Sequence, residues 1–282
     1  MFISTLVATE DLAAHLDDPN WVVLDCRFTL TDPEAGRQAY LKDHIPGAHY
    51  VHLDQDMAAP ITETSGRHPL PDMHMLATRL SAWGVGVNKQ VVVYDDSYGA
   101  MAVRLWWMLR WLGHPGAALL DGGYPKWRKE QRPLTASQSQ PGKAQFVCLA
   151  EPSQIAHVDD VLRASQTGDA LIIDARPDRR FSGEYEPLDP VAGHIPGSVN
   201  WPFDENLDID GTFLPPEALR ENYQTLLHGR APWQVIHSCG SGVTACHNLL
   251  AMEVAGLSGS RLYPGSWSEW IRDPARPVAT GE

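Results

Sequence analysis

Four short runs of mostly aliphatic residues punctuate the chain, at positions 22–24, 90–93, 171–173 and 235–236. They contain too few polar alternations for strands with one solvated face, which is typical of buried strands in parallel sheets. Stretches with helical periodicity lie between them. The alternation predicts an α/β fold in which helices flank mainly parallel sheets.

The same pattern occurs twice, in the same order. WVVLDCRF in the first half corresponds to ALIIDARP in the second, and DHIPGAHYVHLD corresponds to GHIPGSVNWPFD. Further along, VVVYDDSYGAMAVRLWWMLRWLG corresponds to QVIHSCGSGVTACHNLLAMEVAG, which pairs Asp96 with Cys239, and LLDGGYPKW corresponds to RLYPGSWSEW. An internal repeat of this length indicates two tandem domains of one fold.

Chain length agrees with two domains. With 282 residues the chain exceeds the usual size of a single core. Residues 131–145 are poor in apolar residues and rich in Ser, Gln and Pro, which is typical of a linker. We therefore predict an N-terminal domain at 1–135, a linker at 136–150 and a C-terminal domain at 151–282.

Composition and charge exclude several classes of protein. Apolar residues make up 43% and charged residues 20% of the chain, the balance of an ordinary folded domain. The formal net charge of −13 disfavours a polyanion-binding surface, so we expect no nucleic-acid partner. No apolar run approaches the roughly 20 residues that span a bilayer, and the N-terminal stretch lacks a basic targeting leader. We expect no membrane association and a cytoplasmic location.

The cysteines and histidines do not form a metal-binding pattern. The four cysteines are scattered and include no CxxC pair, which argues against a disulfide framework. The histidines show no HExxH motif and no zinc spacing with cysteine. We assign no metal and no cofactor.

Cys239 is the strongest candidate for chemistry. It follows a predicted buried strand and precedes a predicted helix, and turns of this kind in parallel sheets bind ligands. Gly240 and Gly242 remove the Cβ atoms that would keep a tight loop from turning its N–H groups toward one point. The helix N-terminus adds a partial positive charge. Together these features favour a thiolate at Cys239, whereas a core cysteine needs no flanking glycines.

The other cysteines and several repeated polar residues are interpreted as structural. Cys26 and Cys246 fall on a strand end and inside a helix, which is typical of core cysteines. Residues that occur in both copies, including the copy that lacks a counterpart of Cys239, are assigned to turns and structural ion pairs. They are His44, His194, and the pairs Asp25 with Arg27 and Asp174 with Arg176.

At these residues the chain resembles the tandem rhodanese family. The segment CGSGVTA, 239–245, resembles the active loop of the 3-mercaptopyruvate sulfurtransferases, and both HIPG turns and LYPGSWSEW also fit the family. The resemblance implies two rhodanese-like α/β domains with an active C-terminal half. Asp96 would take the cysteine's place in the inactive half, where a carboxylate cannot carry sulfane sulfur.

The resemblance also implies a mechanism. The Cys239 thiolate attacks the sulfur of a small-molecule donor, pyruvate leaves as its enolate, and a persulfide remains in the loop. Cyanide or a thiol acceptor such as thioredoxin then takes the sulfur. The loop is expected to bind the donor through its N–H groups, and the Ser241 hydroxyl to polarise the donor or deliver a proton. The N–H groups concerned belong to Gly240, Ser241, Gly242, Val243 and Thr244.

Three residues of the first copy match family positions near the active cysteine. Asp54 and His68 would form a proton relay with Ser241, and Arg104 would bind substrate. The alternatives are ordinary surface groups for Asp54 and His68, and an ion-paired structural residue for Arg104.

Donor choice depends on cations outside the uncharged loop. Arg180 matches the first of two family arginines that bind the donor's carboxylate and keto groups, and Arg179 is the weaker match. The second family arginine would follow a Glu-Pro pair, but Leu188 stands there. Either another cation reaches the donor or the donor differs. Thiosulfate:cyanide sulfurtransferase is therefore the main alternative to a 3-mercaptopyruvate enzyme.

Two other functions fit less well. A cysteine phosphatase of related fold would need an arginine six positions after the cysteine, and Ala245 stands there. A non-catalytic rhodanese-like binding module is disfavoured because Cys239 and both loop glycines are present.

Overall fold

The computed structural model describes residues 2–140 and 142–281. Three residues lie outside the described part of the chain. They are Met1, the first residue of the predicted N-terminal domain, Pro141, within the predicted linker, and Glu282, the last residue of the predicted C-terminal domain. The chain forms two compact units. The first contains the residues up to 59 together with 71–151 and 208–213, and the second contains 60–70, 152–207 and the residues from 214 onward.

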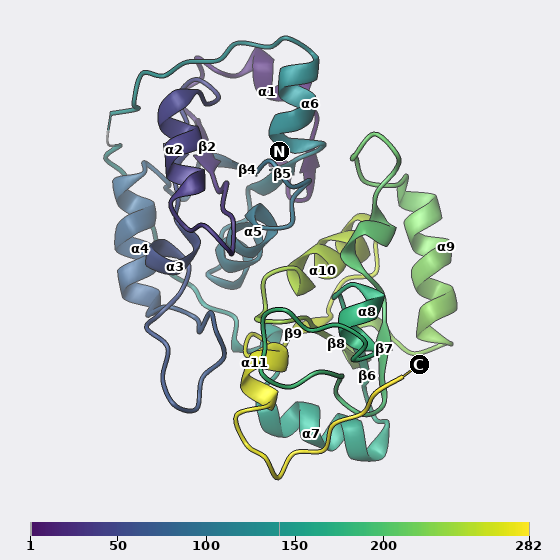
Figure 1. The fold of residues 1–282 in the computed structure, drawn as a ribbon. Coiled ribbons are helices and arrows are strands. Elements are labelled where there is room, and N and C mark those ends of the chain that lie inside the picture. The colour runs from purple at the N-terminus through teal and green to yellow at the C-terminus, as the bar shows by residue number, and fades with distance from the viewer. Residues whose placement is uncertain (1, 141, 282) are drawn as a thin grey trace. The chain divides into compact units, whose positions relative to one another are not determined.

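The first unit is built on a parallel sheet with strand order β1-β5-β4-β2-β3. The strands are β1 (Leu6–Val7), β2 (Trp21–Asp25), β3 (His49–Tyr50), β4 (Gln90–Tyr94) and β5 (Ala117–Leu120). Helices α1 (Thr9–Ala14), α2 (Ala35–Lys42) and α6 (Gly123–Lys129) pack on one face through a core around Val23, Val92 and Trp127. Helices α4 (Met73–Ala82) and α5 (Ala102–Trp111) lie on the other, and α3 spans Leu53–Asp56 (Figure 1).

The second unit repeats this plan with four parallel strands in the order β7-β6-β8-β9. They are β6 (Leu171–Asp174), β7 (Ser198–Asn200), β8 (Val235–Ser238) and β9 (Arg261–Leu262). Helices α7 (Val158–Thr167) and α11 (Ser266–Trp270) cover one face, and α9 (Pro216–Leu227) and α10 (Ala245–Val254) cover the other. The remaining elements are α8 (Asp178–Phe181) and the 3-10 turns Pro152–Gln154, Phe203–Asn206 and Pro232–Gln234.

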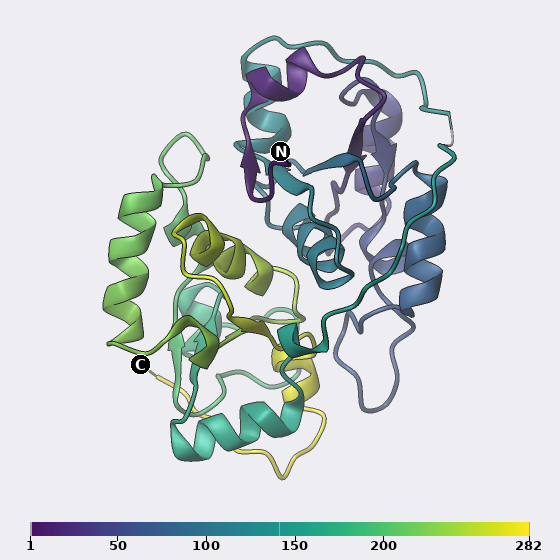
Figure 2. The ribbon, with the colours of Figure 1, turned by 180° about the vertical axis from the view of Figure 1, so that it is seen from behind.

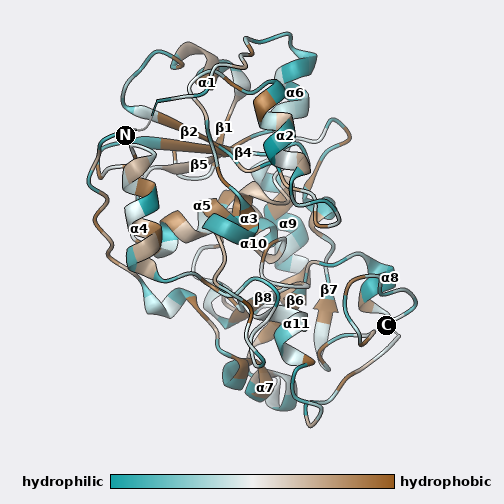
Figure 3. Ribbon diagram, turned by 60° about the vertical axis from the view of Figure 1, so that its left-hand side comes forward, coloured by the Kyte–Doolittle hydropathy of each residue, from teal (hydrophilic) through white to brown (hydrophobic). Residues whose placement is uncertain are grey.

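All four predicted strands are present, and the α/β class with parallel sheets is confirmed. The strands are buried along nearly their whole length, as their continuous aliphatic runs predicted. Figure 3 colours the ribbon by hydropathy and shows hydrophobic brown on strands of the first sheet. In each unit the helix that follows the last strand packs buried tryptophan against one face of the sheet. The residues are Trp127 on α6 in the first unit and Trp267 and Trp270 on α11 in the second.

The predicted linker is extended chain that bonds to the first unit. The Phe146 amide donates to Ser81 Oγ at 3.0 Å, and the amides of Leu149 and Glu151 donate to the carbonyls of Leu112 and Trp111, both at 2.9 Å. Figure 2 shows this segment passing along α4. The domain boundaries given above stay a prediction. The compact units differ from them in that residues 60–70 group with the second unit and residues 208–213 with the first.

Candidate active site

Cys239 is the first residue after β8, and six residues later α10 begins at Ala245. The start of α11 holds this turn. The Cys239 amide donates to Ser266 Oγ at 3.1 Å, and the carbonyls of Cys239 and Gly240 accept from the amides of Trp267 and Ser268 at 3.0 and 2.9 Å. The strand β8 and the start of α11, both buried, therefore fix the backbone of Cys239.

The two loop glycines are required for different reasons. Gly242 has a φ of +73°, and a Cβ built on it would lie 2.3 Å from the Pro264 carbonyl oxygen. Gly240 has no such strain, but a Cβ there would lie 3.1 Å from an Arg67 guanidinium nitrogen and 3.4 Å from two of Arg180. A side chain at 242 would collide with backbone, and one at 240 would crowd two cations.

The corresponding turn of the first unit shows what this geometry binds. Asp95 directly follows β4, and its carboxylate accepts four backbone N–H bonds from the turn and the start of α5. The donors are Ser97 and Gly99 at 2.9 and 2.8 Å, and Met101 and Ala102 at 2.8 Å each. A strand-to-helix turn of this repeat therefore gathers N–H groups around the side chain of its first residue.

The structure corrects one pairing made from the sequence. Strand register places Tyr94 opposite Asp25 and Ser238 opposite Asp174, so the residue after each, Asp95 and Cys239, are equivalent. Asp96 is therefore not the residue at the cysteine's position. The first unit has one more residue between β4 and α5 than the second has between β8 and α10. An alignment without gaps therefore matches the two helices but shifts the residues at the strand ends by one position.

A chain of alternating acidic and basic side chains runs from the carboxyl end of β6 to the cysteine loop. Asp174 pairs with Arg176 at 2.7 Å, Arg176 with Glu186 at 3.5 Å, Glu186 with Arg180 at 2.9 Å, and Arg180 with Asp189 at 3.1 Å. Arg67 closes this chain of charges by pairing with Asp189. Burial opposes the charge of Arg176, but Asp174 and Glu186 raise its pKa above the ordinary value. Burial also raises the pKa of Asp189, although Arg67 lowers it.

Arg180 thus lies beside the loop, as predicted for a donor-binding residue, although its binding role stays a prediction. Arg179 points away, since its side chain is 67% exposed and pairs with Glu184. Leu188 is partly exposed and provides no cation. Sequence reasoning missed Arg67, which lies far from Cys239 along the chain. Its one signal is that it directly precedes His68 in GRHPLP.

His68 and Ser241 are brought together within the second unit. His68 Nδ1 lies 2.7 Å from Ser241 Oγ, a hydrogen bond whose direction depends on the imidazole tautomer. Asp54 and Arg104 belong to the first unit, on α3 and α5, and the roles predicted for them stay predictions. A histidine that touches the loop hydroxyl has the position needed to pass a proton to or from it.

The residues assigned to structure make equivalent bonds in both units. Arg27 and Arg176 each form a bidentate pair with an aspartate two residues earlier, at 2.6 to 3.0 Å in the first unit and 2.7 to 3.0 Å in the second. His44 and His194 each bond a backbone carbonyl through Nδ1, at 2.7 and 2.8 Å. Because the first unit keeps them although it has Asp95 in place of Cys239, these contacts stabilise the fold.

Of the other three cysteines, two lie in the core and Cys148 is only partly buried. Cys26 and Cys246 are fully buried, and burial raises the pKa of Cys26 well above its ordinary value. Within residues 2–140 and 142–281, no group of three or more His, Cys, Asp or Glu side chains could hold a metal ion. No helix in that part of the chain is long and apolar enough to cross a membrane.

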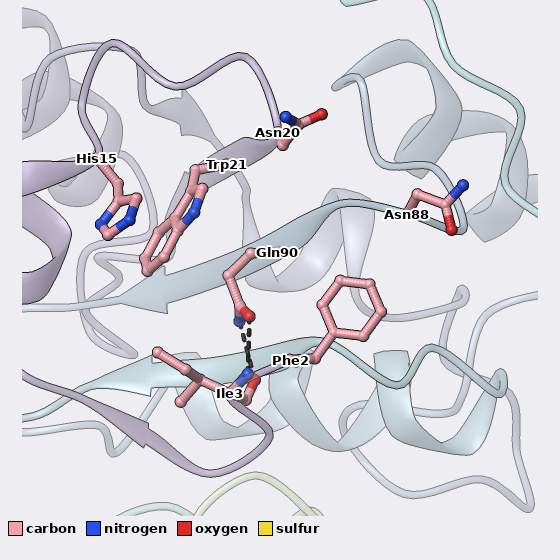
Figure 4. Close-up of a pocket in the computed structure, with 7 residues that line it drawn as sticks. All are labelled: Phe2, Ile3, His15, Asn20, Trp21, Asn88 and Gln90. Atoms are coloured by element: carbon pink, nitrogen blue, oxygen red, sulfur yellow. Dashed lines mark hydrogen bonds between the residues drawn. The ribbon is translucent and has the colours of Figure 1, made fainter.

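A cavity of about 410 Å³ lies in the first unit, away from the cysteine-equivalent turn. Figure 4 shows its lining, in which the Gln90 amide exchanges two hydrogen bonds of 2.9 Å with the backbone of Ile3, and His15 lies beside Trp21. It sits at the amino end of the strands, whereas Asp95 and Cys239 follow the carboxyl ends of theirs.

Comparison with known proteins gives a consistent result. The family model described as rhodanese-like domain matches residues 8–130 and again 157–273. A protein of Pseudomonas aeruginosa named probable 3-mercaptopyruvate sulfurtransferase is 48% identical over 288 residues, covering 100% of both chains. A Mycobacterium tuberculosis protein named putative thiosulfate sulfurtransferase SseB is 38% identical over 281 residues, covering 98% of this chain and 97% of its own.

Among solved structures, SseA from Escherichia coli is similar at a TM-score of 0.81 and 32% sequence identity. The match covers 94% of this chain and 100% of that one, and its description names the rhodanese fold and the mechanism of 3-mercaptopyruvate sulfotransferases.

Proposed function

This chain belongs to the rhodanese-like domain family, with two tandem copies, and we propose that it is a sulfurtransferase that takes sulfur from 3-mercaptopyruvate. The resemblance predicted from the sequence is thereby confirmed at the level of the family. In the proposed reaction Cys239 carries the transferred sulfur as a persulfide. The observation that carries the proposal is the position of Cys239 at the start of a strand-to-helix turn whose counterpart in the first unit surrounds a carboxylate with four N–H groups.

The Cys239 thiolate attacks the donor's thiol sulfur, the donor's carbon–sulfur bond breaks, and its electron pair passes to carbon as the enolate of pyruvate. Protonation of that carbon gives pyruvate, and Cys239 keeps the sulfur as a persulfide. N–H groups of the loop are proposed to stabilise the anionic sulfur before and after transfer, as four N–H groups of the equivalent turn hold the Asp95 carboxylate. The acceptor thiolate then attacks the outer sulfur and restores the cysteine.

Ser241 and His68 are the proposed proton path for the enolate. Their 2.7 Å hydrogen bond lies on the loop that carries Cys239. A hydroxyl backed by an imidazole can give a proton to the carbon or oxygen of the leaving group and recover it from the ring. Arg180 is proposed to bind the donor's carboxylate, which needs a cation because the loop 239–245 carries no charged side chain.

Thiosulfate is the second candidate donor. It is favoured by the lack of an arginine at Leu188 and by the similarity to the mycobacterial protein named for thiosulfate. The acceptor is a thiol or cyanide. Thioredoxin as the protein acceptor and a cytoplasmic location are further proposals.

The test is steady-state sulfur transfer to cyanide from each donor at equal concentration, by wild type, Cys239→Ser and Cys246→Ser. Cys246 is the matched control because it lies in the same segment and is buried like Cys239, but it stands inside α10 rather than on the loop. The proposal expects a preference for 3-mercaptopyruvate, no transfer by Cys239→Ser and normal transfer by Cys246→Ser. A preference for thiosulfate would replace the donor, and transfer by Cys239→Ser would reject the mechanism.

A further inference from the structure

Ser266 has a backbone conformation that serine rarely adopts. Four non-glycine residues among those that the structure describes have a positive φ, and three of them are exposed. Ser266 is the fourth, with a φ of +52° and a fully buried side chain at the start of α11. A Cβ in this left-handed region approaches the following carbonyl oxygen, so such a conformation persists where the surrounding structure or the function requires it.

The repeat contains a counterpart of Ser266 without a side chain. Gly123 is the first residue of α6, as Ser266 is of α11, and its φ is +57°. In both units the next amide donates to the carbonyl of the residue that begins the turn, Asp95 at 2.8 Å and Cys239 at 3.0 Å. A Cβ on Gly123 would lie only 2.7 Å from the Asp95 carbonyl oxygen. The shared backbone therefore favours glycine, and the second unit carries serine against that preference.

The Ser266 hydroxyl makes two hydrogen bonds that glycine cannot make. It accepts from the Cys239 amide at 3.1 Å and donates to the Tyr263 carbonyl at 2.9 Å. The donated bond fixes the hydroxyl, and its lone pair then holds the amide. Because the Cys239 carbonyl is held by the Trp267 amide, both polar groups of the cysteine backbone are fixed. The Cα–Cβ bond that carries the sulfur therefore keeps one direction.

We propose that Ser266 is a positioning residue for the sulfur of Cys239, and that its strained backbone is retained because only a side chain there can hold the Cys239 amide. The inference rests on the proposed function, in which Cys239 carries the sulfur. It accounts for the difference between the units. The Asp95 carboxylate is oriented by four N–H bonds of its own, whereas a thiolate has a single atom for such bonds and depends more on the backbone that carries it.

Two substitutions separate the hydroxyl from the strain. Ser266→Gly and Ser266→Ala both remove the hydroxyl, but only alanine keeps a Cβ in the left-handed conformation. We expect Ser266→Gly to fold, because Gly123 takes the same conformation in the first unit, and to have a Tm about 2 to 4 °C above that of Ser266→Ala. A positioning role predicts equal functional loss in the two variants, whereas a merely structural role predicts a loss that follows the Tm.

Sulfur transfer and alkylation measure the functional loss. In both variants kcat for 3-mercaptopyruvate should fall roughly 10- to 100-fold while KM changes by less than about twofold. Iodoacetamide forms a bond between Cys239 Sγ and its methylene carbon with loss of iodide. Peptide mass spectrometry should show this reaction to be about 3- to 10-fold slower in both variants, because the sulfur is less well held as a thiolate.

Ser165→Ala is the matched control. The Ser165 hydroxyl also bonds a backbone carbonyl, that of Pro196 at 2.6 Å, but it stands on α7 and does not contact the turn. Its loss should lower the Tm and leave both kcat and the alkylation rate at their wild-type values.

Normal kcat and normal alkylation in Ser266→Gly would overturn the inference. A loss confined to Ser266→Ala would also overturn it, because that loss would follow the strained backbone and not the hydroxyl. Alkylation does not depend on sulfur transfer, so the two proposals fail separately. If both variants react slowly with iodoacetamide but wild type transfers no sulfur from 3-mercaptopyruvate, the role of Ser266 stands and the donor assignment falls. If wild type uses 3-mercaptopyruvate and Ser266→Gly matches it in both assays, only the role of Ser266 falls.

Discussion

Gly242→Ala tests the geometry of the cysteine loop, and Gly168→Ala provides its control. Both glycines have a left-handed backbone, with φ of +73° and +70°. They differ in their surroundings. A Cβ at 242 would lie 2.3 Å from the Pro264 carbonyl oxygen and 2.8 Å from the Pro264 Cα, whereas a Cβ at 168 meets nothing within 4 Å.

The two free-energy costs can be separated. Alanine in a left-handed conformation costs about 1 to 2 kcal/mol, which applies to both variants. At position 242 either the loop or Pro264 must also move by about 1 Å, and overpacking of this kind costs a further 1 to 3 kcal/mol. We therefore expect Gly168→Ala to lower the free energy of unfolding by about 1 to 2 kcal/mol and Gly242→Ala to lower it by about 2 to 5 kcal/mol.

Urea denaturation followed by tryptophan fluorescence measures both costs, and sulfur transfer measures the consequence for the site. Movement of the loop displaces the N–H groups around Cys239, so Gly242→Ala should lose most of its activity while Gly168→Ala keeps it. Equal destabilisation by the two substitutions, with normal transfer by Gly242→Ala, would refute the close approach of the loop to Pro264.

Three further predictions follow from the same structure. Asp95→Ala deprives four backbone N–H groups of their acceptor and should lower the free energy of unfolding by about 3 kcal/mol or more in urea denaturation, whereas Asp95→Asn, which keeps one acceptor oxygen, should cost about half as much. Ser241→Ala should lower kcat for 3-mercaptopyruvate by roughly 100-fold with little change in KM, and an unchanged kcat would remove Ser241 from the proton path. Burial lowers the pKa of His237 from 6.5 to about 3, so the unfolded chain binds the extra proton between these values and stability is lost as the pH falls. Between pH 8 and pH 5 this amounts to about 2 kcal/mol, and His237→Gln should show a correspondingly smaller loss in urea denaturation at the two pH values.

Most of the fold could be predicted because its signals are local and occur twice. The aliphatic runs that form β2, β4, β6 and β8 are continuous, and each copy repeats its HIPG turn and its terminal tryptophan. Cys239 was identifiable for the same reason, since a cysteine between a buried strand and a glycine-containing turn is a local pattern. The buried Asp–Arg pairs were likewise marked by their occurrence in both copies.

Two features could not be read from the sequence in this way. The equivalence of Asp95 and Cys239 depends on strand register. The turn of the first unit has one extra residue, and because Asp95 and Asp96 are adjacent and identical, the sequence does not show which of them corresponds to Cys239. Arg67 reaches the loop because residues 60–70 dock on α11, a long-range contact fixed by Gly66 and Ser268. No local pattern specifies which distant segment fills that surface.

Mass spectrometry of the protein after one turnover shows whether Cys239 carries the sulfur. Wild type is mixed with 3-mercaptopyruvate without an acceptor, digested after the thiols are blocked, and compared with Cys239→Ser. We expect one added sulfur atom on the peptide that contains Cys239, one pyruvate released per chain, and neither product in Cys239→Ser. Sulfur found on Cys26, Cys148 or Cys246 instead, or pyruvate released by Cys239→Ser, would contradict it.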